Sequence, residues 1–429
     1  MMPAKDLLES NELSQISDED EFPSKNPDND ASSLEKNIVV PNDGRVFKKA
    51  DPKRTRGSSI GNVRVAPLST PLPRRLQTAA VLWHTISIPV FITIFFISLA
   101  IPIFWLIAVP YLFYLFTDRT PSNGQVTKRY SERFRKLSVW KYFCNYYPVK
   151  LFKTHNLEPT FTEVEIKDDY YRLPPPLSYL FKINKKPYKK LQKTGPKYIF
   201  GLHPHGVVSL SGFGGIGTDG ANWSKLFPGI PVCLLTLLNQ FYIPLFRDYL
   251  LALGITSAGR NNALKILKQG FSLAIVVGGA QESLLARPES TEIVLQKRKG
   301  FIKLALETGN VSLVPCYCFG ENELYNILEP DEDSYWRKLQ LWLKKSFGFT
   351  IPFFHARGVF NYDFGLLPFR KEVTLVTGKP IPVPFLPSPK KTEVDYYHEL
   401  YVNELQRIFD EYKTKFQEDG QNSTLKIVE

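Results

Sequence analysis

The sequence predicts an α/β protein with a mainly parallel sheet and flanking helices, preceded by a membrane-embedded helical hairpin. Three observations lead to this prediction. From about residue 130, strand-like apolar runs alternate with amphipathic segments, which is typical of right-handed crossovers between parallel strands. Residues 76–117 form a run of 42 residues without Lys, Arg, Asp or Glu. Two of the six histidines, His203 and His205, follow one strand-like run directly.

Length and charge limit the classes of protein that fit. With 429 residues and 43% hydrophobic content, the chain can bury a large core. The net charge of +12 indicates an anionic partner, such as nucleic acid, a membrane surface or a phosphorylated molecule. Nucleic acid is not expected, because the positive charge gathers beside the apolar run and after residue 282, and no known nucleic-acid module is present. The four cysteines form no CxxC pair, which favours reduced, buried thiols in a cytosol-facing protein.

Residues 1–75 are predicted to be a disordered cytosolic arm. Residues 1–44 hold eleven acidic residues against three lysines, and residues 45–75 hold nine basic residues against one acid. Such a composition has too little apolar surface to form a core. The amino terminus also lacks the basic-then-apolar order of a cleaved signal peptide.

The uncharged run 76–117 is predicted to be a membrane hairpin. As one straight helix it would extend about 63 Å, roughly twice the ~30 Å hydrocarbon core of a bilayer. Pro102 favours a break, which leaves residues 79–100 long enough to span and residues 103–117 short for that purpose. Lys and Arg flank both ends, so both ends are expected in the cytosol. A buried core hairpin of a soluble protein remains an alternative.

Residues 118–420 are predicted to form one domain, and residues 421–429 a tail. Residues 160–190, rich in charge, tyrosine and proline, are expected to be a surface insertion. Apolar runs bounded by glycine predict the strands, and segments of helical periodicity predict the helices. The predicted strands are 197–203, 271–279 and 311–320, and the predicted helices are 261–270, 299–309 and 394–416.

The histidine pair is the main candidate site. Two imidazoles fall short of the three or four ligands of a metal centre, so no metal is predicted. A histidine can act as a general base at neutral pH, best when a carboxylate supports it. Glu282 follows the next predicted strand, and the ends of parallel strands meet at one edge of a sheet. A glycine turn that contains a capped histidine is the alternative.

Several motifs resemble the type-2 diacylglycerol acyltransferase family. They are FGLHPHG (200–206), GGAQES (278–283), RKGFIKLAL (298–306), VPCYCFGENELY (314–325) and RGVFNYDFGLLPFR (357–370). The resemblance covers roughly residues 78–420. It implies transfer of a fatty acyl group from acyl-CoA to the free hydroxyl of diacylglycerol, which forms triacylglycerol for lipid droplets. It also implies an enzyme of the endoplasmic reticulum membrane and the lipid droplet whose catalytic domain faces the cytosol.

The resemblance further implies a fold like that of the glycerol-phosphate acyltransferases. Those relatives pair their histidine with an aspartate five positions later, where this chain has Val208 and Leu210. Glu282 is therefore the expected orienting acid. Acyl-CoA would be a co-substrate, and no separate cofactor is expected. The expected partners are acyl-CoA, diacylglycerol and membrane lipid, and a homo-oligomer remains open.

The resemblance gives each motif residue an expected role. His205 would be the base, Glu282 would stabilise the imidazolium, and His203 would support the turn or bind the thioester oxygen; the choice between the histidines stays open. Backbone amides near Gly206 and Gly279 would form an oxyanion hole, and Pro204 and Gly278 are expected to lie beside them in the substrate-binding site. Basic residues after the glycine loop would bind CoA phosphates or face acidic lipid headgroups. This basic group comprises Arg287, Lys297, Arg298, Lys299 and Lys303, with Gly300 beside them. Glu321 and Asn322 are expected either to line the site or to cap a helix.

Two other functions remain open at this point. One is a sister acyltransferase that uses monoacylglycerol or a fatty alcohol as acceptor. The other is a non-catalytic lipid-droplet scaffold, which has no need of the HPHG and GGAQE motifs.

Overall fold

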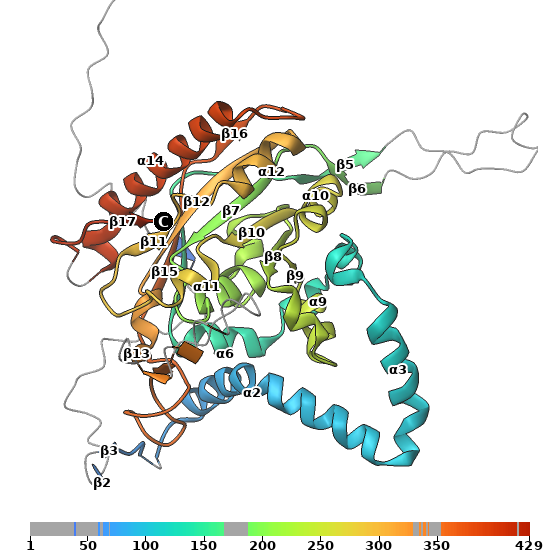
Figure 1. Cartoon of the computed structure of the whole chain (residues 1–429), viewed down its shortest axis with the longest axis vertical. Helices are drawn as coiled ribbons and strands as arrows, with labels where there is room; N and C mark the ends of the chain where they lie inside the picture. Colours follow the sequence, from blue (N-terminus) through green and yellow to red (C-terminus); the bar gives the residue numbers. More distant parts are fainter. Residues whose placement is uncertain are drawn as a thin grey trace, which may run out of the picture. The chain divides into compact units, whose positions relative to one another are not determined.

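A nine-stranded mixed sheet organises the chain (Figure 1). The computed structural model describes residues 38–39, 59–60, 63–67, 69–166, 188–328, 334–335, 338–339, 342, 353–417 and 420–429. The strands follow the order β1-β4-β15-β12-β7-β10-β8-β9, with β16 paired to β12. Their bounds are β1 Ile38–Val39, β4 Val149–Lys153, β7 Lys197–His203, β8 Val232–Thr236, β9 Ile255–Ser257, β10 Ser272–Val276, β12 Val311–Phe319, β15 Val373–Thr377 and β16 Ile381–Val383.

The five strands from β12 to β9 are parallel, as predicted, whereas β15 and β16 run antiparallel to β12. The sheet is therefore mixed. Strand β7 begins and ends where the sequence predicts, and all seven of its residues are buried. A continuous buried run of this kind is typical of a parallel strand covered on both faces. In register, His203 lies opposite Tyr317 of β12, and Leu202 opposite Val276 of β10.

Three helices cover one face of the sheet, namely α10 (Arg260–Lys268), α12 (Gly300–Thr308) and α14 (Lys391–Phe416) (Figure 1). All three were predicted from helical periodicity. The buried stripe of α14 includes Leu405, Ile408 and Phe409, as expected. Leu400 and Val402 are only half-buried, and Tyr401 takes the inward position between them. This shift brings a hydroxyl group under the centre of the sheet.

The other face is covered by the π-helical turn η3 (Gly212–Gly217) and by α6 (Ser138–Tyr146), on which α2 (Leu72–Ala100) packs. Arg370 links these layers. Its guanidinium donates to the Gln77 side chain at 2.6 Å and lies over the Tyr146 ring at 4.0 Å from the centroid. The first turns of α2 are thereby attached to the domain.

Helix α2 is followed by the short helix η1 (Pro102–Phe104) and then α3 (Trp105–Thr117), so the break occurs at Pro102 as predicted. Among the described residues, α2 is the one helix long and apolar enough to cross a membrane by length and composition. Both helices expose large apolar side chains, such as Phe96 of α2 at 62%, and Leu106, Ile107 and Phe116 of α3 at more than 70% each. The alternative of a buried core hairpin does not fit this exposure.

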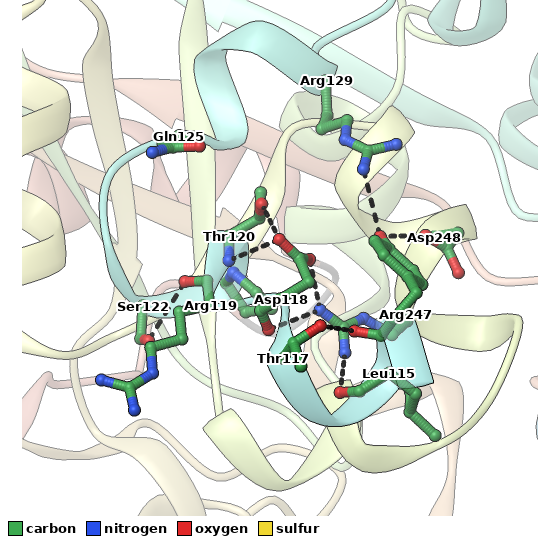
Figure 2. A network of polar contacts seen from close by, with 12 residues as sticks. Leu115, Thr117, Asp118, Arg119, Thr120, Ser122, Gln125, Arg129, Arg247 and Asp248 are labelled. Atoms are coloured by element: carbon green, nitrogen blue, oxygen red, sulfur yellow. Dashed lines mark hydrogen bonds and ion pairs between the residues drawn. The ribbon is translucent and has the colours of Figure 1, made fainter. Parts of the chain in front are cut away.

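A polar network fixes the end of α3 (Figure 2). Buried Arg247, from α9 (Phe246–Ala252), donates to the Leu115 carbonyl at 2.9 Å and to the Asp118 carboxylate at 2.6 Å. A cation at a helix C-terminus satisfies carbonyls that lack partners within the helix. The apolar helix thus returns to the domain through a buried ion pair.

Three of the predicted segments contain structure that the sequence did not indicate. Residues 63–67 of the expected arm contact the domain, where Val65 bridges Asn361 and Arg64 pairs with Asp363 at 2.5 Å. The insertion contains a two-stranded sheet, β5 (Phe161–Ile166) with β6 (Tyr188–Lys193), and residues 167–187 lie outside the described residues. The expected tail contains β17 (Lys426–Val428), which pairs in parallel with β11 (Glu292–Val294) in a separate two-stranded sheet. Most of residues 1–62 also lie outside the described residues.

Candidate active site

Three strand ends meet at the carboxyl edge of the sheet. Strand β7 leads to the histidine loop, β10 leads to the short helix α11 (Gly279–Glu282), and β12 leads to η5 (Glu321–Leu324). Because β10 and β12 lie on opposite sides of β7, a crevice is expected at the end of β7. His205 and Glu282 are in direct contact, as the sequence predicts, but the Glu282 carboxylate contacts the His205 backbone N–H and not the imidazole ring.

His203 belongs to the core. Its side chain is completely buried, and Nε2 lies 3.0 Å from the Tyr401 hydroxyl. The Tyr401 hydroxyl donates to the Gly201 carbonyl, so Nε2 of His203 must carry the hydrogen that joins the two side chains. Burial lowers the pKa of His203 to about 3, which keeps the ring neutral. This histidine is held as part of the sheet.

His205 is half-buried, and its ring is oriented by its own loop. Nδ1 lies 2.9 Å from the Gly206 carbonyl oxygen. A carbonyl can only accept a hydrogen bond, so Nδ1 carries the hydrogen and Nε2 presents a lone pair. Burial lowers the pKa of His205, and the Gly206 carbonyl acts in the opposite direction. A neutral imidazole with a free Nε2 is the form that a general base needs.

Glu282 holds the backbone of the loop and not the imidazole ring. One carboxylate oxygen accepts from the His205 backbone N–H, and the other accepts from the Val294 N–H at 2.7 Å. The expected contact with the ring is therefore replaced by a clamp on two amides. Burial raises the pKa of Glu282 to about 7, while the two amides and Arg298 lower it. A Cβ at Gly278 would lie 2.0 Å from the carboxylate, which explains the glycine.

Glu321 forms a second clamp of the same kind. Its carboxylate oxygens accept from the backbone N–H groups of Leu210 and Ser211, both at 2.9 Å. Burial raises its pKa to about 7. Gly206 has a φ of +64°, and a Cβ there would lie 2.5 Å from the Glu321 side chain. The two expected roles of Glu321, lining the site or capping a helix, are thus replaced by anchoring of the loop.

The two clamps grip the segment 204–211 near its two ends, since Glu282 holds the amide of His205 and Glu321 holds those of Leu210 and Ser211. Buried carboxylates paired with backbone amides make strong, directional contacts. The loop that carries His205 is therefore fixed before any substrate arrives. Pro204 is buried within it.

The glycines and Asn322 differ in what surrounds them. Gly279 has a φ of +59°, and neither it nor Gly300 has a heavy atom within 4 Å of the place of a Cβ. Open space at Gly279 is compatible with a ligand near its backbone. Asn322 donates to the Ser290 carbonyl at 2.8 Å, and its buried Oδ1 has no hydrogen-bond partner among the described residues.

Some of the basic residues expected to bind CoA phosphates are already paired. Lys299 forms an ion pair with Asp395 at 2.6 Å, and Lys297 pairs with Glu429. Arg298 donates to Gln281 at 3.3 Å. Arg287 and Lys303 are exposed. Three of the five basic residues therefore already contact other side chains of the protein.

Two other expectations concern metal ligands and thiols. In the part of the chain that the structure describes, no three His, Cys, Asp or Glu side chains gather in a way that would hold a metal ion. The four cysteines are buried and free, as predicted. Sequence reasoning missed Tyr401, which is 198 residues from His203, because it assigned Leu400 and Val402 to the inward face of α14.

Comparisons with known proteins identify the family. The model of the diacylglycerol acyltransferase family matches residues 96–164 and 178–426. A diacylglycerol O-acyltransferase 1 of Eremothecium gossypii is 53% identical over 379 residues, covering 86% of this chain and 82% of the relative. The diacylglycerol O-acyltransferase 1 of Saccharomyces cerevisiae is 50% identical over 358 residues, covering 82% and 86%.

A solved structure, the 1-acyl-sn-glycerophosphate acyltransferase of Thermotoga maritima, aligns at 14% identity over 75% of this chain and 96% of that chain. Its TM-score of 0.30 is too low to support a conclusion. The family match includes every motif of the site, and the two relatives cover 86% and 82% of this chain. This chain belongs to the diacylglycerol acyltransferase family.

Proposed function

We propose that this chain transfers a fatty acyl group from acyl-CoA to the free hydroxyl of diacylglycerol, forming triacylglycerol, with His205 as general base. The observation that carries the proposal is the free Nε2 of a neutral His205 on a doubly clamped loop. The family and the names of the two fungal relatives support the reaction.

The chemistry follows from a thioester that is already activated. Nε2 of His205 takes the proton of the acceptor hydroxyl while its oxygen attacks the thioester carbon. The tetrahedral intermediate then collapses, the carbon–sulfur bond breaks, and the imidazolium returns the proton to the leaving CoA thiolate. Backbone amides near Gly206 and Gly279 are the proposed donors to the oxyanion. No covalent enzyme intermediate and no cofactor is needed.

The clamps supply preorganisation. The Glu282 carboxylate lies next to the His205 backbone, so its charge also favours the imidazolium that forms during the reaction. In this proposal Glu282 replaces the aspartate of the glycerol-phosphate acyltransferases, and the parallel strands from β12 to β9 correspond to their fold. Glu282 and Glu321 are positioning residues, because both act through the loop.

The site is proposed to face the cytosol at the endoplasmic reticulum membrane and on lipid droplets. Helices α2 and α3 would form one hairpin whose two ends stay on the cytosolic side. The outward apolar side chains and the basic flanks support this arrangement. Glycosylation tags at residues 60 and 130 test it, since both positions should remain unglycosylated. Glycosylation at either position would indicate a single span.

The function is tested by expression in a host that lacks triacylglycerol synthesis, with analysis of the neutral lipids that accumulate. Triacylglycerol is expected, and the His205→Ala variant should give none at equal abundance. Wax ester, or diacylglycerol made from monoacylglycerol, would assign the sister activity. No new lipid from a folded, membrane-bound protein would support the scaffold alternative.

A further inference from the structure

The RGVFNYDFGLLPFR motif (357–370) begins and ends with an arginine, and the proposed chemistry uses neither. Its backbone closes into a hairpin, because Arg357 and Leu367 exchange two hydrogen bonds of 2.9 Å. We call this segment the 357–367 hairpin. The segment before α2 also holds it, since Val65 forms a bridge with Asn361. The side chains of the hairpin are therefore carried on a backbone that is fixed at both ends.

Arg357 is a buried cation whose strongest donors are unused. The residue is 8% exposed, and its guanidinium carbon lies 4.6 Å from the centre of the Tyr362 ring. Nε donates to the Gly358 carbonyl at 3.4 Å, and the two terminal nitrogens have no acceptor among the described residues. Neither nitrogen belongs to the unpartnered polar atoms that the protein encloses completely, so both retain accessible surface. They can therefore reach a ligand.

A second arginine shares an aromatic ring with Arg357. The guanidinium carbons of Arg357 and Arg370 lie 5.8 Å and 4.0 Å from the centre of the Tyr146 ring. The hydrogen bonds of Arg370 all go to neutral oxygens of α2 and of the Tyr146 backbone. Burial lowers the pKa of Arg370 to about 10, and the positive charge of Arg357 contributes to this lowering. Both charges thus lack a neutralising carboxylate among the described residues.

The acidic residues of this region are already paired with other cations. Asp363 in the hairpin forms an ion pair with Arg64, and Glu372 forms one with Lys150 at 2.7 Å. A buried charge without a counter-ion is costly, so an anion that enters beside Arg357 is stabilised. The planar fork of an arginine matches the oxygens of a phosphate group. The hairpin is therefore suited to bind a phosphate.

The hairpin also exposes large apolar side chains. Phe360 is 77% exposed, Phe364 70% and Leu366 57%. Arg370 connects this segment to the first turns of α2, where the apolar helix begins. Exposed apolar side chains next to basic residues are typical of segments that lie on a membrane surface and attract acidic lipids. Phosphate and hydrocarbon would thus meet the same hairpin.

This combination favours a phospholipid over acyl-CoA. In a phospholipid the phosphate lies directly beside the acyl chains, whereas a long polar arm separates the phosphates of acyl-CoA from its acyl chain. A phospholipid with a net negative charge fits better than phosphatidylcholine, because the phosphate of phosphatidylcholine already carries a quaternary ammonium next to it. The two arginines supply the opposite charge.

We infer that the 357–367 hairpin, together with Arg370, binds the phosphate group of an anionic phospholipid at the membrane surface. Arg357 is the main donor, and Phe360 and Phe364 lie among the acyl chains. The site goes beyond the proposed function, because its ligand is neither a substrate nor a product of acyl transfer. It gives the domain a second contact with the bilayer, separate from the apolar helices.

The first test is photolabelling of the full-length protein in phosphatidylcholine nanodiscs that contain a small fraction of phosphatidic acid with a diazirine on one acyl chain. Labelled peptides should include residues 356–370. Unlabelled phosphatidic acid should compete, and diacylglycerol, which has no phosphate, should not. Equal competition by diacylglycerol, or no label in this segment, would overturn the inference. Displacement by acyl-CoA would assign the site to the phosphates of the acyl donor and would also overturn it.

The second test compares two arginine and lysine changes in the same segment. Arg357→Gln removes a charge-assisted donor, so the apparent dissociation constant for phosphatidic acid, taken from the saturation of labelling, should rise about 10-fold. Lys371→Gln is the matched control, because it removes the same charge from an exposed neighbouring position. It should change the constant by less than about twofold. Equal effects of the two variants would show that only net charge matters and would contradict the site.

Two milder variants serve if Arg357→Gln does not fold. Arg357→Lys keeps the charge but loses the planar fork, so the apparent dissociation constant should rise about threefold. Phe360→Ser, at an exposed position, should lower the labelling yield by removing a contact with the acyl chains. Wild-type labelling in both variants would contradict the inference. Absence of triacylglycerol from the wild-type enzyme would instead refute the proposed function and would leave the labelling result unchanged.

Discussion

His203 and His205 lie two residues apart and occupy opposite surroundings. His203 is fully buried at the end of β7, and its ring is joined to Tyr401 of α14. His205 is half-buried on the loop, with Nδ1 bound to a carbonyl and Nε2 free. The comparison teaches that one motif combines two tasks, since the first histidine fixes the strand end and the second is available to react.

The largest effect is expected from His205→Ala. Loss of a general base typically lowers the rate by ~10²–10⁴-fold. The measurement is triacylglycerol formation by purified enzyme from labelled acyl-CoA and diacylglycerol. His155→Ala is the matched control, because His155 is exposed and distant in sequence from the motif. More than about half of wild-type activity in His205→Ala would contradict the assignment.

The second-largest effect is expected from the two carboxylates that hold the loop of His205, Glu282 and Glu321. In Glu282→Gln or Glu321→Gln, the amide NH₂ would face a backbone N–H that now meets a carboxylate oxygen. A lost buried hydrogen bond of this kind costs about 1–3 kcal/mol, which corresponds to about 10–10²-fold in rate if the loop loses its position. Glu399→Gln on the exposed side of α14 is the control. Wild-type turnover in both clamp variants would show that the loop needs neither.

The pH dependence of stability tests the burial of Glu282. Its pKa of about 7 in the folded protein exceeds the ordinary value of 4.5, because burial disfavours the charged form. The folded state then binds more protons than the unfolded state between these values. The contribution of Glu282 is therefore present below about pH 4.5 and is lost as the pH rises toward 7.

The measurement is the difference in the free energy of unfolding between wild type and Glu282→Gln across that window. The difference should become less favourable to wild type as pH increases. A difference that grows with pH would show that the carboxylate has a lowered pKa.

The smallest effect on turnover is expected from a change at Tyr401, the partner of His203. Tyr401→Phe removes the acceptor of the His203 Nε2–H and should lower the free energy of unfolding by about 1 kcal/mol. Turnover should change less than in any clamp variant. Tyr396→Phe, on the exposed side of the same helix, is the control. A loss of turnover as large as that of His205→Ala, without a loss of stability, would move the chemistry to His203.

The sequence was most informative where a local pattern determines the structure. The apolar run of β7 and the break at Pro102 are both local signals, and both appear where they were predicted. The meeting of His205 with Glu282 followed from the geometry of parallel strands. Such inferences need only the strand ends and their order.

The features that the sequence did not predict depend on contacts between distant segments. The residue type of Glu282 does not reveal that its carboxylate accepts from two backbone N–H groups and not from the His205 imidazole. Which group it contacts depends on the path of the loop. The pairing of β17 with β11 and the contact of Tyr401 with His203 join segments more than 100 residues apart. Neither has a periodic signature in the sequence.

The central claim is that Nε2 of His205 takes the proton, and chemical rescue tests it most directly. His205→Gly and His203→Gly enzymes would be assayed for triacylglycerol formation with and without added imidazole. Imidazole should restore activity to His205→Gly in a concentration-dependent manner, because that position is partly open to solvent. It should not restore His203→Gly, because that site is closed. Rescue of His203→Gly without rescue of His205→Gly would contradict the account.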